Sequence, residues 1–151
     1  DLLLFMDADY SVPISEVEKG LHLLNIGYDV AIGSRGITGS DVTARQNIFR
    51  ESSAKIYTFI QNRYLGIHYK DTQCGFKLFT QRATRTLFPI QKLNSVIFDP
   101  EILWLAKQTS LRVAEFPVIW RHVPDSRIRY DNIKKSIFVF QELFKIPRIH
   151  R

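Results

Sequence analysis

Cysteine and long hydrophobic runs are the two features that this sequence has least of. Cys74 is the only cysteine among 151 residues, which excludes an internal disulfide framework and a multi-cysteine zinc site and makes a reducing compartment the default expectation. No apolar run approaches the roughly 18 residues that span a bilayer. The longest runs, Leu2–Met6 and Ile137–Phe140, have the length of a strand or belong to an amphipathic helix.

Familiar catalytic motifs are missing as well. The sequence contains no G-x-S-x-G, Walker or G-x-G-x-x-G pattern, and its four histidines lack the spacing of metal ligands. Nothing therefore supports the chemistries that those motifs serve. No signal peptide is visible, but the chain starts with Asp1 directly before a strand-like run, so we expect an N-terminal portion to be missing.

Positive charge is concentrated in the last quarter of the chain. The formal net charge is +6, and the segment from Arg112 to Arg151 alone carries nine basic against four acidic residues. Such a segment predicts contact with an anionic partner, either lipid headgroups, phosphates or nucleic acid. An ordinary solvated basic surface explains the charge equally well.

The first third of the chain has the pattern of a strand–helix–strand unit. Leu2–Met6 is a short apolar run typical of a buried strand in a parallel or mixed sheet. Ser15 and Glu18 form a capping box before an apolar-periodic segment, and Gly27 is suited to end that helix. Tyr28–Ile32 reads as the next strand, so a βαβ unit is expected.

The rest of the chain continues the alternation of helices and strands. Asp99 before Pro100 has the form of a helix N-cap followed by proline, and one proline in the last strand candidate favours a sheet edge. With 45% hydrophobic residues and no repeats or linkers, one α/β domain fits. The expected elements are a loop at Gly36–Asp41, a helix at Thr43–Tyr64, a loop entering a strand at Asp71–Phe79, a helix to about Lys107, a strand at Leu111–Trp120 and a helix at Asn132–Lys145.

Two carboxylates directly follow the first strand, in Asp7-Ala8-Asp9. Ligands of open α/β sheets collect at the carboxyl ends of strands. Two hard oxygen ligands there would hold Mg²⁺ or Mn²⁺ against a diphosphate. The competing interpretation is a turn in which Asp9 accepts local backbone hydrogen bonds.

The order of the motifs along the chain indicates a particular protein family more specifically than any single motif does. It runs through an apolar strand with DAD, then VAIGSR, Arg45 and Arg50, DTQCGFKLF, FDPE and a basic amphipathic tail. This order resembles the family 2 glycosyltransferases of GT-A fold, and within them the dolichyl-phosphate β-glucosyltransferases and their bacterial polyprenyl-phosphate relatives. The resemblance implies an α/β, GT-A-like (Rossmann-like) mixed sheet flanked by helices, here without the N-terminal strands that bind the nucleotide base.

The resemblance also implies roles for individual residues. Asp7 and Asp9 would be the metal and diphosphate ligands, with Mg²⁺ or Mn²⁺ as cofactor. Arg35, with Ser34 in the same turn, and Arg45 and Arg50 on the following helix would bind phosphate, most plausibly the acceptor's. Guanidinium groups bind phosphate oxygens in bidentate fashion. Surface arginines on a solvated helix face are the alternative interpretation.

The DTQCG loop supplies further candidates. Asp71 and Gln73 are expected to bind the sugar or assist the acceptor, since a glycine in the loop would let the backbone approach a ligand; a turn-capping Asp71 is the alternative. Lys77 is a candidate phosphate ligand, although a lysine on a strand face fits equally well. Cys74 is expected to be a packed small residue rather than a nucleophile.

Asp99 and Glu101 compete for the role of catalytic acid–base residue. Asp99 has the N-cap position as a structural alternative, and Glu101 would favour the helix dipole whatever its function. We favour Asp99, because a cap residue can direct its carboxylate outwards. A phosphate acceptor is already ionised at neutral pH and needs no strong general base.

The sequence therefore predicts a hexosyltransferase that moves a sugar, glucose by resemblance, from UDP-glucose to dolichyl or undecaprenyl phosphate. It would act at the cytoplasmic face of a membrane, bound peripherally or anchored by a segment outside this chain. A GDP-mannose-dependent mannosyltransferase or a transferase that extends a polysaccharide or glycan remains open. A nucleic-acid-binding module using the basic tail is a non-enzymatic alternative with weak support, since the aromatic residues of the tail have helical spacing.

Overall fold

A four-stranded mixed sheet forms the middle layer of the computed structural model, which describes residues 1–43, 48–95, 97–121 and 133–151 and, within them, all side chains except those of 43, 48–52 and 133–136. The strands lie in the order β1 (Leu2–Met6), β4 (Phe76–Thr80), β2 (Val30–Ser34) and β5 (Val113–Pro117). β4 is antiparallel to both of its neighbours, and β2 is parallel to β5.

The expected βαβ unit is present in a split form. β1 and β2 run in the same direction, but β4 lies between them. Four of its five residues are buried, which suits the inner position of a sheet covered on both faces. The strand expected at Leu111–Trp120 is interrupted after Pro117, and its first part, β5, lies at the sheet edge as predicted. Its continuation, β6 (Ile119–Arg121), pairs in parallel with β3 (Asp41–Thr43), a strand that the sequence did not predict.

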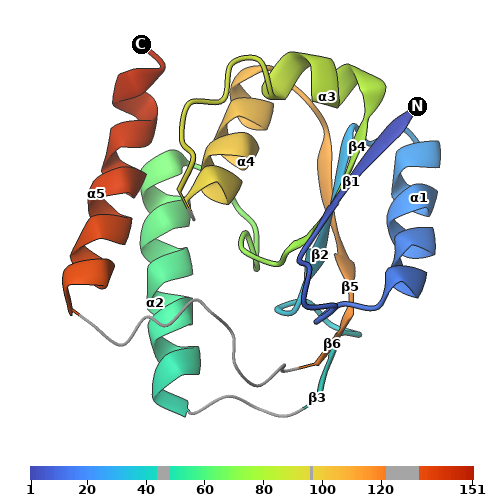
Figure 1. Cartoon of the computed structure of the whole chain (residues 1–151), viewed down its shortest axis with the longest axis horizontal. Helices are drawn as coiled ribbons and strands as arrows, with labels where there is room; N and C mark the ends of the chain where they lie inside the picture. The colour runs from blue at the N-terminus through green and yellow to red at the C-terminus, as the bar shows by residue number, and fades with distance from the viewer. Residues whose placement is uncertain (44–47, 96, 122–132) are drawn as a thin grey trace.

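Helices cover both faces of the sheet (Figure 1). One face packs under α1 (Val17–Asn25), which follows the short 3₁₀ turn Ile14–Glu16. The other face lies under the remaining helices, and the larger apolar core fills the space between. These helices are α2 (Ile48–Leu65), α3 (Gln81–Leu87), α4 (Phe98–Gln108) and α5 (Ile133–Ile149).

Two helix starts differ from expectation. The capping box at Ser15 does not form, because Ser15 lies in the 3₁₀ turn and α1 begins after Glu16, whose buried carboxylate accepts from the Ile119 backbone N–H at 3.3 Å. Gly27 ends α1 as predicted, with φ +99° and its N–H bonded to the Leu24 carbonyl. Asp99 is not an N-cap either: α4 begins one residue earlier, and Asp99 stands in its first turn.

The helix α5 has apolar residues on an outward side. Its periodicity places Ile137 and Phe144 on one apolar face, suited either to packing or to a membrane surface, and these two side chains are 51% and 36% exposed. The helix instead packs against α2 and α4 with a different stripe, because its partners are helices rather than the sheet. The buried residues of its described part are Val139, Glu142, Leu143 and Ile146.

The long helix α2 is described from Ile48, and Thr43, where the helix was expected to begin, belongs to β3 instead. The helix also carries exposed apolar residues. Ile56 is 61% and Phe59 71% exposed. Within the described residues, no helix combines the length and the apolar character required to cross a membrane.

Candidate functional site

Charged residues from distant parts of the chain meet where β1 and β2 end and β4 begins. Because β4 runs antiparallel to its two neighbours, the loop before it lies at their carboxyl ends. We call the residues gathered there the charged cluster: Asp7, Asp9, Arg35, Asp71, Lys77 and Asp99. Electrostatic interactions connect its members, since Arg35 and Lys77 both act on Asp7 and on Asp71.

The position of the Asp7 side chain depends on Gly75. The Asp7 backbone N–H donates to the Gly75 carbonyl at 2.9 Å, and a Cβ atom at Gly75 would overlap the Asp7 carboxylate. The glycine of the DTQCG loop thus makes room for an Asp side chain; the expected close approach of a ligand to this loop stays a prediction. Burial and the neighbouring charge of Asp9 raise the pKa of Asp7, and Lys77 and Arg35 partly oppose this.

Asp9 has the local hydrogen bond that the competing interpretation predicted. Its Oδ1 accepts from the Ser11 backbone N–H at 2.9 Å, which leaves Oδ2 for another ligand. Among the described residues, no group of three or more His, Cys, Asp or Glu side chains could hold a metal ion by itself. Two exposed carboxylates fit a Mg²⁺ or Mn²⁺ ion shared with a diphosphate, because Mg²⁺ commonly takes one or two protein carboxylates beside substrate phosphates.

Arg35 and Asp71 form a closely bonded ion pair. The Asp71 carboxylate accepts from Arg35 Nε at 2.6 Å, from its Nη2 at 3.0 Å and from its backbone N–H at 3.0 Å. Burial would raise the pKa of Asp71, but Arg35 holds it below its ordinary value. The guanidinium also lies over the Trp120 ring, 5.5 Å from its centroid. Asp71 therefore orients Arg35, whose Nη1 edge takes no part in the pair.

The loop before β4 is tied to its surroundings on several sides. The Gln61 and Thr72 side chains hydrogen-bond each other at 2.9 Å in the buried contact with α2. The Glu115 carboxylate of β5 accepts from the backbone N–H of Asp71 at 3.0 Å. The Gln73 N–H donates to the Asp71 side chain at 3.2 Å, the turn-capping bond that was the alternative for Asp71. Cys74 is buried, and burial raises the pKa of its thiol to about 12, in keeping with a packing role.

Lys77 points into the protein. Its side chain is 1% exposed, and its Nζ donates to the Cys74 carbonyl at 2.6 Å and lies 2.7 Å from Oδ1 of Asp99. The Asp99 side chain is 11% exposed. Burial raises the pKa of Asp99, although Lys77 acts in the opposite direction. A raised carboxylate pKa brings Asp99 closer to the range of a group that exchanges protons near neutral pH.

Several predicted site residues lie elsewhere or outside the described part. Ser34 is fully buried, and its carbonyl and hydroxyl close the turn with Ser40 and Gly36. Glu101 is fully buried and accepts from the backbone N–H groups of residues 92 and 93 and contacts His150 Nε2 at 2.6 Å. Its carboxylate thus secures the segment before α4 and the end of α5. Arg45 lies outside the described residues, as does the side chain of Arg50.

Tyr10 is a site feature that the sequence reasoning missed. It follows Asp9 in a left-handed conformation with φ +55°, and its side chain is 71% exposed. A non-glycine residue in this region is strained, and such strain is concentrated at functional sites. No local sequence pattern predicts the left-handed conformation of Tyr10, because the turn after β1 imposes it.

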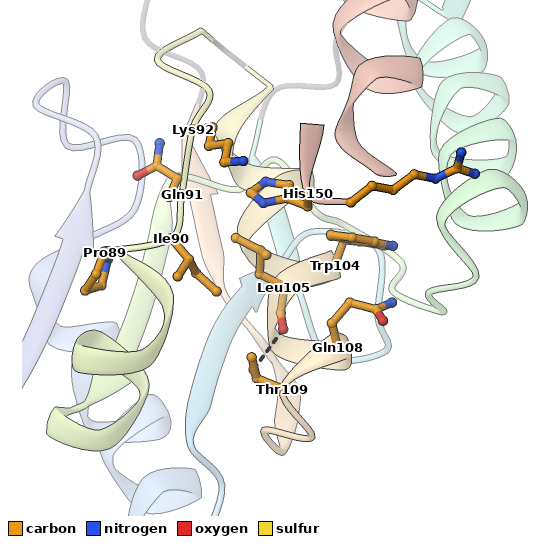
Figure 2. Close-up of a pocket in the computed structure, with 10 residues that line it drawn as sticks. Pro89, Ile90, Gln91, Lys92, Trp104, Leu105, Gln108, Thr109 and His150 are labelled. Atoms are coloured by element: carbon orange, nitrogen blue, oxygen red, sulfur yellow. Dashed lines mark hydrogen bonds between the residues drawn. The ribbon is translucent and has the colours of Figure 1, made fainter. Parts of the chain in front are cut away.

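A surface hollow lies away from the charged cluster. It measures about 520 Å³ and opens beside the carboxyl-terminal end of α4, with Trp104, Gln108 and His150 among the side chains around it (Figure 2). No member of the charged cluster lines it. We therefore place the candidate active site by its chemistry, at the strand ends, rather than by the size of a hollow.

A mixed sheet flanked by helices, with carboxylates and an arginine at its strand ends, is the GT-A-like arrangement that the sequence predicted. The chain belongs to glycosyl transferase family 2, whose family model matches residues 1–88. This confirms the resemblance on which the functional expectation rested, and it makes the chain part of a glycosyltransferase enzyme family.

Among individual proteins, the chain is similar to several dolichyl-phosphate beta-glucosyltransferases. The chain is 36% identical to a dolichyl-phosphate beta-glucosyltransferase of Trichomonas vaginalis, over 93% of this chain and 44% of the relative. It is 34% identical to the dolichyl-phosphate beta-glucosyltransferase of Saccharomyces cerevisiae, over 88% of this chain and 44% of the relative. Against the human enzyme of the same name the identity is 30%, over 83% and 41%. The chain spans less than half the length of each of these three relatives.

Proposed function

We propose that this chain forms the catalytic part of a hexosyltransferase that transfers glucose from UDP-glucose to a polyprenyl phosphate, dolichyl or undecaprenyl, at the cytoplasmic face of a membrane. The observation that carries the proposal is the charged cluster, which combines carboxylates for a metal–diphosphate with an oriented arginine for a second phosphate. The names of the relatives support the choice of acceptor and sugar.

Asp7 and Asp9 form the donor side of the site. Their carboxylates would hold Mg²⁺ or Mn²⁺, which supplies positive charge to stabilise the departing nucleoside diphosphate. Gly75 keeps the Asp7 carboxylate seated against the loop, and the Ser11 N–H fixes the Asp9 side chain. The two carboxylates are thereby oriented before any ligand binds, which lowers the cost of binding.

Arg35 forms the acceptor side. Asp71 engages its Nε and Nη2 atoms, so the remaining N–H groups are held in a fixed direction where they would bind the acceptor phosphate. The nucleophile is a phosphate oxygen that is ionised at neutral pH. Asp99, with its raised pKa, would exchange a proton with the hydrogenphosphate form of the acceptor or with a sugar hydroxyl.

The acceptor lipid requires the site to reach a bilayer, and the α2–α5 face is suited to do so. Its exposed apolar side chains include Ile56, Phe59 and Ile137, and its exposed basic side chains include Arg63 and Lys145. Apolar residues bordered by cations favour binding at an anionic membrane surface, each cation contributing on the order of 1 kcal/mol. This face is the proposed membrane contact, with the protein held peripherally or by a segment outside this sequence.

The activity test uses the intact natural protein that carries this sequence. Purified enzyme would receive radiolabelled UDP-glucose or GDP-mannose, together with dolichyl or undecaprenyl phosphate in vesicles. We expect label from UDP-glucose to appear in the lipid fraction as an acid-labile glycosyl phospholipid. Transfer only from GDP-mannose would support the mannosyltransferase alternative, and transfer to a soluble glycan would refute a lipid acceptor.

The membrane contact has its own test. Phe59→Ser combined with Ile137→Ser should reduce co-sedimentation of the intact protein with anionic vesicles at least tenfold, without lowering its thermal stability. Ile26→Ser is the matched control, because Ile26 is 55% exposed beside α1 on the opposite face of the sheet. Equal vesicle binding by the double variant and the control would place the membrane contact elsewhere.

A further inference from the structure

A fully buried lysine needs an explanation. Lys77 is 1% exposed, and it is the one lysine among the described residues that is buried. Removing a charged amine from water costs several kcal/mol unless it is paired and hydrogen-bonded. An apolar residue would serve packing alone better, since Lys77 occupies the inner strand of the sheet opposite Phe5 on β1 and Ile32 on β2.

The contacts of Lys77 connect two segments of the chain. Its Nζ donates to the carbonyl of Cys74, which belongs to the loop before β4, and lies 2.7 Å from the carboxylate of Asp99 in the first turn of α4. Nothing else in the described contacts of Asp99 fixes that carboxylate: its Oδ1 has no hydrogen bond of good geometry, so the lysine acts on it mainly as a charge. Two neighbours of the pair, Phe98 before Asp99 and Phe5 opposite Lys77, pack ring against ring at a centroid distance of 5.1 Å.

This geometry argues against the phosphate-binding role considered for Lys77. An ammonium at 1% exposure, bonded to a main-chain carbonyl and facing a carboxylate, is already committed to groups of the protein. Asp99 keeps 11% of its side chain accessible, so it can meet a ligand while the lysine beneath it cannot. The lysine therefore acts through the aspartate.

We propose that Lys77 is a positioning residue: anchored on the Cys74 carbonyl, its ammonium holds the Asp99 carboxylate at the strand ends beside Asp7 and Asp71. The inference rests on the proposed function for its consequence, since Asp99 is the group placed to exchange a proton with the acceptor. The pair also joins the loop before β4 to α4, so the two segments that frame the site keep one relative position.

The test combines Lys77→Met, Asp99→Asn and the double variant in the intact protein. Methionine keeps the length of the side chain and removes its charge. Each single variant should lower kcat about 30- to 100-fold with the donor KM unchanged within about twofold, because misplacing a reacting group by about 1 Å costs on the order of a hundredfold. The double variant should be no slower than the slower single variant, since both changes remove one unit.

Folding defects are separated from this effect in two ways. If one single variant fails to fold, the kcat of the double variant is compared with that of the single variant that folds, because a buried ion pair can be replaced by neutral residues with little loss of stability; equal rates support one unit, and a further loss of rate contradicts it. Lys19→Met is the matched control: Lys19 also bonds a carboxylate, that of Glu16 at 2.7 Å, and a carbonyl, that of Pro117 at 3.2 Å, away from the charged cluster. It should change stability but not kcat.

Each outcome then has one meaning. A Lys77→Met variant that keeps its kcat, or that raises the donor KM alone, would overturn the positioning role, the second result pointing to direct phosphate binding. If the unmodified protein shows no transfer, the proposed function fails, and the crystal structure of Lys77→Met still decides the geometry. We expect that structure to show the Asp99 carboxylate displaced from its position at the strand ends; an unchanged carboxylate would contradict the inference.

Discussion

Replacing Gly75 by alanine tests the construction of the donor side. The backbone of Gly75 does not have a positive φ, so alanine adds no backbone strain. Its Cβ, however, would overlap all three terminal atoms of the Asp7 side chain. Restoring an ordinary contact requires the carboxylate to move by about 1 Å or more, since Cβ contacts closer than 3.0 Å are essentially never found.

A shift of that size should reduce kcat about a hundredfold, equivalent to about 2.7 kcal/mol on the barrier. The assay is the initial rate of sugar transfer by the intact protein over a titration of Mg²⁺ and Mn²⁺, and we also expect a weaker apparent metal affinity. Gly20→Ala is the control, because its Cβ would meet Leu78 Cδ1 at 2.6 Å under α1, far from Asp7. It should lower the melting temperature and leave the rate per folded molecule intact. If the Gly75→Ala enzyme has a transfer rate within threefold of that of the unmodified protein, the claim that Gly75 positions the Asp7 carboxylate is refuted.

Three further predictions concern the same cluster. Asp7→Asn and Asp9→Asn should each abolish transfer with little loss of folding, and activity undiminished in EDTA would exclude their metal role. Arg35→Ala should raise the acceptor KM about ten- to hundredfold, because a charge-assisted phosphate contact contributes about 1.5–3 kcal/mol; a rise in donor KM alone would assign Arg35 to the diphosphate. The pKa of Asp71 is lower in the folded state, so its contribution to stability is present above about pH 4 and is lost as the pH falls through the folded pKa. The melting temperature of Asp71→Asn should therefore fall less steeply with acid than that of the unmodified protein, and parallel curves would contradict this.

The fold was predictable where local patterns decide it. The apolar runs at β1, β2 and β4 and the stop at Gly27 needed only neighbouring residues. The insertion of β4 between β1 and β2, and the pairing of β3 with β6, depend on contacts between distant segments and were not predictable from spacing. The buried side of α5 depends on distant contacts too: periodicity identified an amphipathic helix and left open whether its apolar face packs inwards, and its helical partners determined which side is buried.

The sequence predicted which residues form the charged cluster better than it predicted what each of them contacts. The strand-end position of Asp7 and Asp9 followed from the DAD pattern. That Asp71 engages Arg35 required the antiparallel register of β4, which brings residues 36 positions apart into contact. Asp99 resembled an N-cap by its position before proline, and only the buried lysine on β4 explains why its carboxylate is directed elsewhere.

The charge balance of the cluster explains why the two carboxylates after β1 are the ones suited to a metal ion. The cluster holds four carboxylates and two cationic side chains, and each cation is committed to one partner: Arg35 to Asp71, and Lys77 to Asp99. Within the described part of the chain, Asp7 and Asp9 have no ion pair of their own, and their mutual repulsion contributes to the raised pKa of Asp7. Two unbalanced negative charges close together favour binding of a divalent cation, or else protonation of one carboxylate. The ion pairs thus do more than stabilise the fold, because they engage two of the four carboxylates and leave Asp7 and Asp9 as the pair that would hold the proposed ion.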